Sequence, residues 1–136
     1  MAEEQTASRI PPFLLGALVC DVAATDPSTG KTSLVGIFDL INVGKFPTAR
    51  PMSLYLRVTD AEGHYPVRVD FVHAEKDALI ARVEGAMDAP DRTVSMDAHF
   101  EFPPLPIPEA GRYEFRIYAS DMYLGGVAVV ARLRAR

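Results

Sequence analysis

The sequence contains a single cysteine, Cys20, and no tryptophan among its 136 residues. One cysteine cannot form an internal disulfide, which excludes a disulfide-stapled secreted scaffold. Because Cys20 lies in an apolar run, we expect it to be a small buried hydrophobe. Positive charge is also scarce, since 14 basic residues face 18 acidic ones and the net charge is −4. This balance argues against general binding to nucleic acid or to anionic membranes.

Targeting signals are missing from the amino-terminal residues. The opening MAEEQTASRIPP is acidic and polar, unlike the basic and apolar start of a secretory signal. The apolar run at 13–24 is too short to span a bilayer and contains Asp21. The sequence therefore predicts a cytoplasmic protein with no membrane segment, a flexible amino-terminal arm over 1–12 and one domain over 13–136.

Sustained helical periodicity is absent as well, and apolar residues alternate with polar ones instead. The alternating runs are 52–60, 65–73, 79–85, 93–102 and 112–118, separated by turn sequences such as DAEGH and DAPDR. This pattern predicts an all-β fold, an antiparallel two-layer β-sandwich of about eight strands that is immunoglobulin-like in broad architecture. The proline-rich PPLPIPEAG at 103–111 is expected to be a packed crossover at one end of the sandwich.

A Gly-Lys-Thr-Ser run in DPSTGKTSL, residues 26–34, raises the question of a phosphate-binding loop. Such a loop needs a first glycine where this chain has Thr25, and its backbone N–H groups must face the phosphate, whereas Pro27 has none. A helix should follow, but the next residues are β-branched and apolar. Asp-Pro-Ser-Thr-Gly is good turn chemistry, so we predict a hairpin turn and no bound nucleotide or other cofactor.

The two segments flanking this turn, 13–24 and 33–43, are apolar on both faces of the expected strands. A strand with one solvated face should alternate, so something must cover the second face. One alternation class contains Leu14, Leu18, Val22, Leu34, Phe38 and Leu40, and the other contains Leu15, Val19, Val35, Ile37, Ile41 and Val43. We predict that Leu15, Val19, Val35, Ile37 and Ile41 form an interface with a second chain, most simply in a homodimer. The alternative is coverage by RIPPF and PPLPIP of the same chain.

Other candidate sites have weaker support. Asp97, His99 and Glu101 share one strand face and could ligate a metal, but residues two apart on a strand are poorly spaced for one ion. A solvated polar face is the favoured explanation, and no catalytic residue is assigned. Asp21 and Asp39 are expected to cap a turn, bind a backbone N–H or pair with an arginine.

Two interpretations concern the tyrosines. Tyr55, Tyr65, Tyr118 and Tyr123 could stack on a sugar, although packing is the commoner role of such residues. Tyr113 occupies the position of a tyrosine corner, in which a buried tyrosine donates its hydroxyl to an upstream backbone group. Its ring is therefore expected to be buried, and Tyr113→Phe is expected to cost about 1 kcal/mol.

The segments LLGALVCDVA, GKTSLVGIFDLI and FEFPPLPIPEAGRYEFRIY together resemble a bacterial family of β-sandwich proteins of unknown function. Here an extra Glu-Ala separates Pro108 from Gly111 of the family's Pro-Gly-Arg-Tyr pattern. The resemblance implies a β-sandwich and transfers no functional residue. The expected function is a non-enzymatic protein-interaction or assembly module, with a small-molecule or carbohydrate-binding β-sandwich as the alternative. A β-sandwich enzyme that uses Asp97, His99 and Glu101 is the third possibility.

Overall fold

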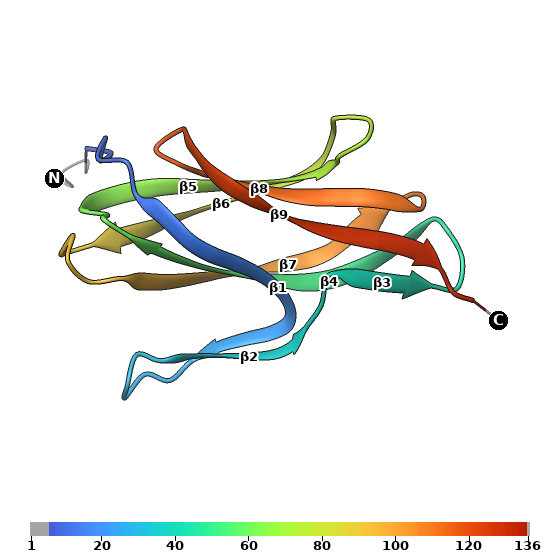
Figure 1. Cartoon of the computed structure of the whole chain (residues 1–136), viewed down its shortest axis with the longest axis horizontal. Helices are drawn as coiled ribbons and strands as arrows, with labels where there is room; N and C mark the ends of the chain where they lie inside the picture. Colours follow the sequence, from blue (N-terminus) through green and yellow to red (C-terminus); the bar gives the residue numbers. More distant parts are fainter. Residues whose placement is uncertain (1–5, 136) are drawn as a thin grey trace, which may run out of the picture.

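The structure, a computed structural model, describes residues 6–135 and consists of two stacked β-sheets (Figure 1). One sheet has the strand order β2-β1-β4-β7 and the other β3-β9-β8-β5-β6. The strands within the described residues are β1 Phe13–Thr25, β2 Thr32–Ile37, β3 Leu40–Val43, β4 Thr48–Thr59, β5 Gly63–His73, β6 Ala78–Ala89, β7 Met96–Ile107, β8 Gly111–Ala119 and β9 Met122–Leu133. The predicted all-β sandwich is confirmed. No helix in the described part of the chain is long and apolar enough to cross a membrane.

The core lies between the two sheets and is built from the alternating runs. Tyr113, Phe115 and Ile117 of β8 are buried, and their neighbours in the sequence are more exposed. Phe102 of β7 and Phe115 of β8 bring their ring centroids to 5.2 Å from opposite sheets. The period-two pattern therefore marks the inward face correctly along most of this layer.

The segment DPSTGKTSL forms a hairpin turn, as predicted. The amide of Gly30 donates to the Asp26 carbonyl at 2.8 Å, and the amide of Asp26 donates to the Lys31 carbonyl at 2.9 Å. Asp26 also accepts from the Ser28 amide through its carboxylate at 2.9 Å. Gly30 has a φ of 72°, a left-handed conformation that favours glycine. The glycine of the Gly-Lys pair is thus used to reverse the chain.

The apolar segment 33–43 was expected to be the second strand of the hairpin, but it forms two strands, β2 and β3. β2 pairs with β1, but after Phe38 and Asp39 the chain crosses to the other sheet, where β3 pairs in parallel with β9. The amide of Val130 donates to the Asp39 carbonyl at 2.8 Å at this crossing. The same apolar run therefore contributes to both layers, which explains why it does not alternate.

The proline-rich segment is a crossover only in its last part, because β7 continues through it to Ile107 and residues 108–110 then cross to β8 in the other sheet. β7 is an edge strand, so the missing N–H groups of Pro103, Pro104 and Pro106 can be tolerated. Leu105 and Ile107 are buried in the core. The connection to β8 is only the short 108–110.

Two buried tyrosines fasten chain segments to the sandwich. The Tyr113 hydroxyl donates to the Glu109 carbonyl at 2.6 Å, and its ring is almost fully buried, which confirms the predicted tyrosine corner. The Tyr65 hydroxyl donates to the Ile10 carbonyl at 2.7 Å. In the expected flexible amino-terminal segment, residues 1–12, Ala7 forms a parallel bridge with His64. Residues 1–5 of this segment lie outside the described residues. The segment around Ile10 therefore lies against the β5 end of the sandwich.

Candidate functional site: the β1–β2 arm

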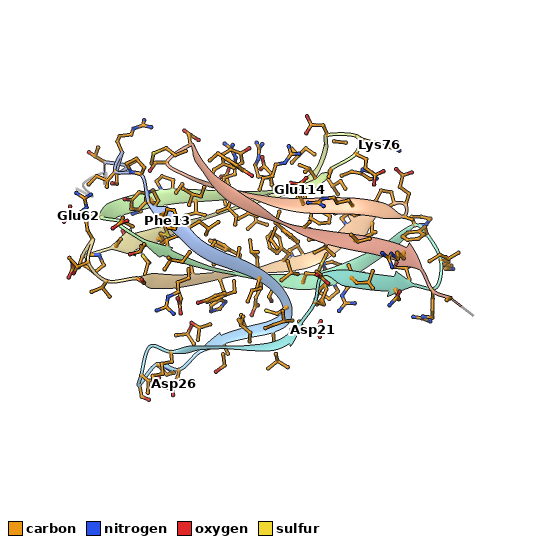
Figure 2. All side chains as sticks on the ribbon, in the orientation of Figure 1. Phe13, Asp21, Asp26, Glu62, Lys76 and Glu114 are labelled. Atoms are coloured by element: carbon orange, nitrogen blue, oxygen red, sulfur yellow. The ribbon has the colours of Figure 1, made fainter. Side chains whose placement is uncertain are left out.

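The first hairpin forms the edge of the four-stranded sheet but bends away from the body of the sandwich (Figure 1). β1 pairs with β4 only as far as Cys20, opposite Ser53, whereas Cys20 to Thr25 pair with β2. In Figure 1, β1 curves sharply near its middle and β2 lies beyond it, below β4 and β7. Figure 2 shows Asp21 at this bend and Asp26 at the far tip. We call residues 21–37 the arm.

The base of the arm is fixed by specific contacts. Arg50 Nη2 lies 2.7 Å from Asp21 Oδ1, and the Arg50 guanidinium lies 4.4 Å from the centre of the Phe38 ring. The expected pairing of Asp21 with an arginine is thereby confirmed. Gly36 has a φ of 70°, and a Cβ at this position would collide with the Asp21 carboxylate. Cys20 is buried at the bend, and this burial first and the nearby Asp21 second raise the pKa of its thiol.

The arm presents large apolar side chains to solvent. Val22, Val35 and Ile37 are 50%, 62% and 56% exposed. Val22 pairs with Val35 and Cys20 pairs with Ile37, and residues paired across neighbouring strands share a face. These three side chains therefore form one exposed apolar face, which we call the arm face.

Of the five predicted interface residues, Leu15, Val35 and Ile37 are exposed, whereas Val19 and Ile41 are buried in the core. The prediction was wrong for these two because it assumed uninterrupted alternation. A β-bulge between Leu14 and Gly16 shifts the register of β1 against β4, so that Val19 points inward. Ile41 belongs to β3 in the other sheet. Val22 from one alternation class and Val35 from the other therefore share the exposed arm face.

Neither proposed segment of the same chain covers the arm face among the described residues. Ile10 lies against Tyr65 on β5, and the prolines of PPLPIP lie on β7, at the edge of the sheet opposite to β2. The exposed fractions of Val35 and Ile37 already include every described residue. Coverage of this face by RIPPF or PPLPIP is therefore wrong.

The edge of the arm is also open. Sheet edges tend to pair with other chains, and proteins protect them with prolines, charges or short strands. β7 has three prolines, β6 carries Arg82, Glu84 and Asp88, and β3 has only four residues. β2 reads TSLVGI, with neither charge nor proline. This lack of charge is the sequence signal that could have singled out the strand.

A hollow of about 600 Å³ separates the arm tip from the outer face of β4 and β7. Its lining residues are Thr25, Gly30, Lys31, Thr32, Tyr55, Arg57, Ser95, Met96 and Asp97. The Tyr55 hydroxyl donates to Asp97 Oδ1 at 2.9 Å, and Arg57 Nε lies 3.5 Å from the same oxygen. Burial first, and the bond to Asp97 second, raise the pKa of Tyr55. The polar groups of this hollow are therefore largely paired with each other.

The candidate metal ligands are spread along β7. Asp97, His99 and Glu101 pair in register with Arg57, Tyr55 and Ser53 of β4. The Asp97 carboxylate accepts the Tyr55 hydroxyl, as described above. Across residues 6–135, no three metal-ligating side chains gather in one place. The structure thus gives these residues positions on a polar sheet face.

A polar cluster that the sequence did not indicate joins two turns. His73 is buried with Nε2 3.1 Å from Glu109 Oε1, and Lys76 Nζ lies 2.5 Å from the same oxygen. The hydrogen bond from Lys76 is the main cause that lowers the pKa of Glu109. Because Tyr113 binds the Glu109 backbone, the cluster fixes the β5–β6 turn against the β7–β8 turn. We assign it a structural role.

Residues 15–130 match the model of a family described as a family of unknown function, DUF6941. The chain belongs to this family. A comparison with curated proteins found no match. The resemblance to a family of unknown function is thereby confirmed. The matched segment of this DUF6941 protein contains the whole arm and the face of the sheet beneath it.

Proposed function

We propose that this DUF6941 protein is a non-enzymatic interaction module that binds another protein chain through the β1–β2 arm. The observation that carries the proposal is the exposed arm face beside an unprotected strand edge. Leaving such side chains in water forgoes about 1.5–3 kcal/mol for each one that a partner could bury. An open strand edge supplies backbone groups that an incoming strand can pair with, in the mode called β-augmentation.

The base of the arm supports the same proposal. Arg50 of β4 pairs with Asp21 and lies over Phe38, so both ends of the arm are anchored at its base to the body of the sandwich. A binding element that is already ordered loses less conformational entropy on association. The exposed arm face and the anchored base together support a role in docking.

Site-specific photo-crosslinking tests the proposal. A photoreactive amino acid at Val35 is compared with the same residue at Leu79, which is similarly exposed, at 53%, but lies on β6 of the other sheet. In the native host we expect protein adducts from position 35 that are weak or absent from position 79. The adducts from position 35 should disappear when Ile37→Asp is added. Equal labelling from both positions, or none from position 35, would contradict the proposal.

A second candidate function is small-molecule or carbohydrate binding in the hollow beneath the arm. The observation in its favour is a space of about 600 Å³ that contains Tyr55, whose ring could stack on a sugar. Against it, the hydrogen-bonding groups of Tyr55 and Asp97 already pair with each other. NMR titration with a saccharide panel decides, because binding in the hollow should shift the signals of Ser95 and Met96 and be lost in Tyr55→Ala.

A cytoplasmic location and a bacterial source complete the proposal. The lone buried thiol of Cys20 supports a compartment in which disulfides are not needed. The bacterial source rests on the family resemblance noted in the sequence. Fractionation of the native host tests the location, since recovery in an extracytoplasmic fraction would contradict it.

A further inference from the structure

We infer that the chain bound by the arm is a second copy of this protein, with the two β2 strands side by side and antiparallel about a two-fold axis. This inference rests on the proposed function, because it names the occupant of the same surface. It extends each sheet across the dimer, in the order β7-β4-β1-β2 followed by β2-β1-β4-β7 of the second copy. Figure 1 shows that β2 lies away from the rest of the sandwich, which leaves room for such a neighbour.

The charges at the two ends of β2 point to self-pairing. Lys31 precedes the strand and Asp39 follows it, and both side chains are exposed. Among the described residues neither forms an ion pair within 4.0 Å. Between them the edge is uncharged. Antiparallel pairing of two copies brings opposite ends together, so Lys31 of each copy approaches Asp39 of the other, whereas parallel pairing would bring like charges together.

The spacing of these residues fixes a register. Lys31 and Asp39 are equally distant from Val35 in the sequence, so a two-fold axis at Val35 turns the Lys31 end of each β2 toward the Asp39 end of the other. Lys31 directly precedes β2, and Asp39 lies two residues past its end, where the chain crosses to β3. A shift of the pairing by two residues moves one charged end past the other by about 6.8 Å. That is within the screening length of about 8 Å at physiological ionic strength, so the attraction survives a small change of register.

The apolar side chains agree with this arrangement. In the Val35 register the two Val35 side chains oppose each other, and Ile37 opposes Ser33 of the second copy on the same face. Because Val22 pairs with Val35 within each chain, a continuous apolar row crosses the four central strands. A two-fold axis is also the commonest symmetry of protein assemblies. Backbone pairing, apolar contact and charge therefore favour the same partner.

Charge reversal tests the inference directly. In K31E and in D39K, each homodimer would contain two like-charge contacts in place of two attractive ones. We expect the dimer dissociation constant, measured by sedimentation velocity, to rise about tenfold or more in each variant. The double variant K31E/D39K restores opposite charges and should dimerise like the original protein. K45E, which reverses an exposed lysine outside the arm, is the matched control and should leave dimerisation unchanged.

Mixing the two single variants gives the sharpest test. A heterodimer of K31E with D39K has an opposite-charge pair at both ends, so the mixture should dimerise although each variant alone does so weakly. Loss of folding cannot produce this rescue, and far-UV circular dichroism of each variant checks that the sheets are intact. A 14.9 kDa monomer at about 100 μM, unaltered dimerisation of the single variants, or no rescue in the mixture would each overturn the inference.

The outcomes also separate this inference from the proposed function. A monomeric protein whose Val35 crosslinks to a different protein would overturn the homodimer and leave the interaction module. A monomeric protein with no adducts at Val35 would overturn both. Self-adducts at Val35, together with rescue in the mixture, would support both.

Discussion

The tyrosine corner permits a quantitative prediction. The Tyr113 ring is 1% exposed and stacks on Phe71 with centroids 5.4 Å apart. Its hydroxyl donates to the Glu109 carbonyl at 2.6 Å and accepts from the Glu109 amide at 3.3 Å. Tyr113→Phe keeps the ring and removes both bonds. A typical net hydrogen bond contributes about 1 kcal/mol, and the buried partners are left unpaired, so we expect a loss of about 1–2 kcal/mol.

This loss should be visible in thermal unfolding. At about 2.1 cal/mol/K for each residue, the unfolding entropy of a chain of this length is about 0.29 kcal/mol/K. The melting temperature should therefore fall by about 4–7 °C in Tyr113→Phe. Tyr123→Phe is the control, because its ring is 58% exposed, and its melting temperature should change by less than about 2 °C.

The pH dependence provides a second measurement of the same group. Burial raises the pKa of Tyr113 above its ordinary value of 10.0, so the folded chain holds this proton more tightly than the unfolded one. The stabilisation is complete below about pH 10 and is lost as the pH rises through the folded pKa. The difference between the original protein and Tyr113→Phe should therefore shrink in strong base. If both tyrosine variants melted alike at pH 7, the assigned hydrogen bonds would be wrong.

Two further predictions concern the arm and the polar cluster. Gly36→Ala should lower the free energy of unfolding by about 1–3 kcal/mol in urea titrations, because its φ is 70° and the added Cβ meets the Asp21 carboxylate; an unchanged midpoint would contradict this. In Lys76→Met, the melting temperature should fall by less between pH 6 and pH 3 than it does in the original protein. The pKa of Glu109 is lowered by Lys76, so its stabilisation is present above the ordinary value of 4.5 and lost as the pH falls through the folded pKa. Identical melting curves against pH between 6 and 3 would refute that account.

Much of the fold was predictable from the sequence because it depends on local signals. The alternation in 112–118 marks the buried face of β8, and the Asp26–Gly30 turn is recognisable from its residue types alone. The burial of Tyr113 followed from its position near the start of a strand, where a tyrosine corner is expected. In each case the physical cause, a strand with two unlike faces or a glycine with positive φ, acts within a few residues of the chain.

The rest depended on pairing between distant segments. The segment 33–43 has no proline or glycine pair to mark the crossing at Asp39, which follows from β3 finding β9 in the other sheet. The bulge at Leu14–Gly16 is visible only against β4, and it is what turns Val19 inward. The prolines of β7 suggested a loop because the sequence does not say which strand lies at an edge. For the same reason, the sequence did not show that β2 is an edge strand with one unpaired side.

The arm itself is the feature that packing does not explain. Beyond Cys20 its strands pair with each other and not with β4, so the sandwich core closes without Val22, Val35 or Ile37. A segment with no part in the core is normally free to become a short polar loop. Here it stays apolar and uncharged along its edge, and Arg50 and Gly36 hold its base in one geometry. A strand lying against β2 would remove part of the cost of this exposed apolar area, which supports the proposal that the arm is a docking element.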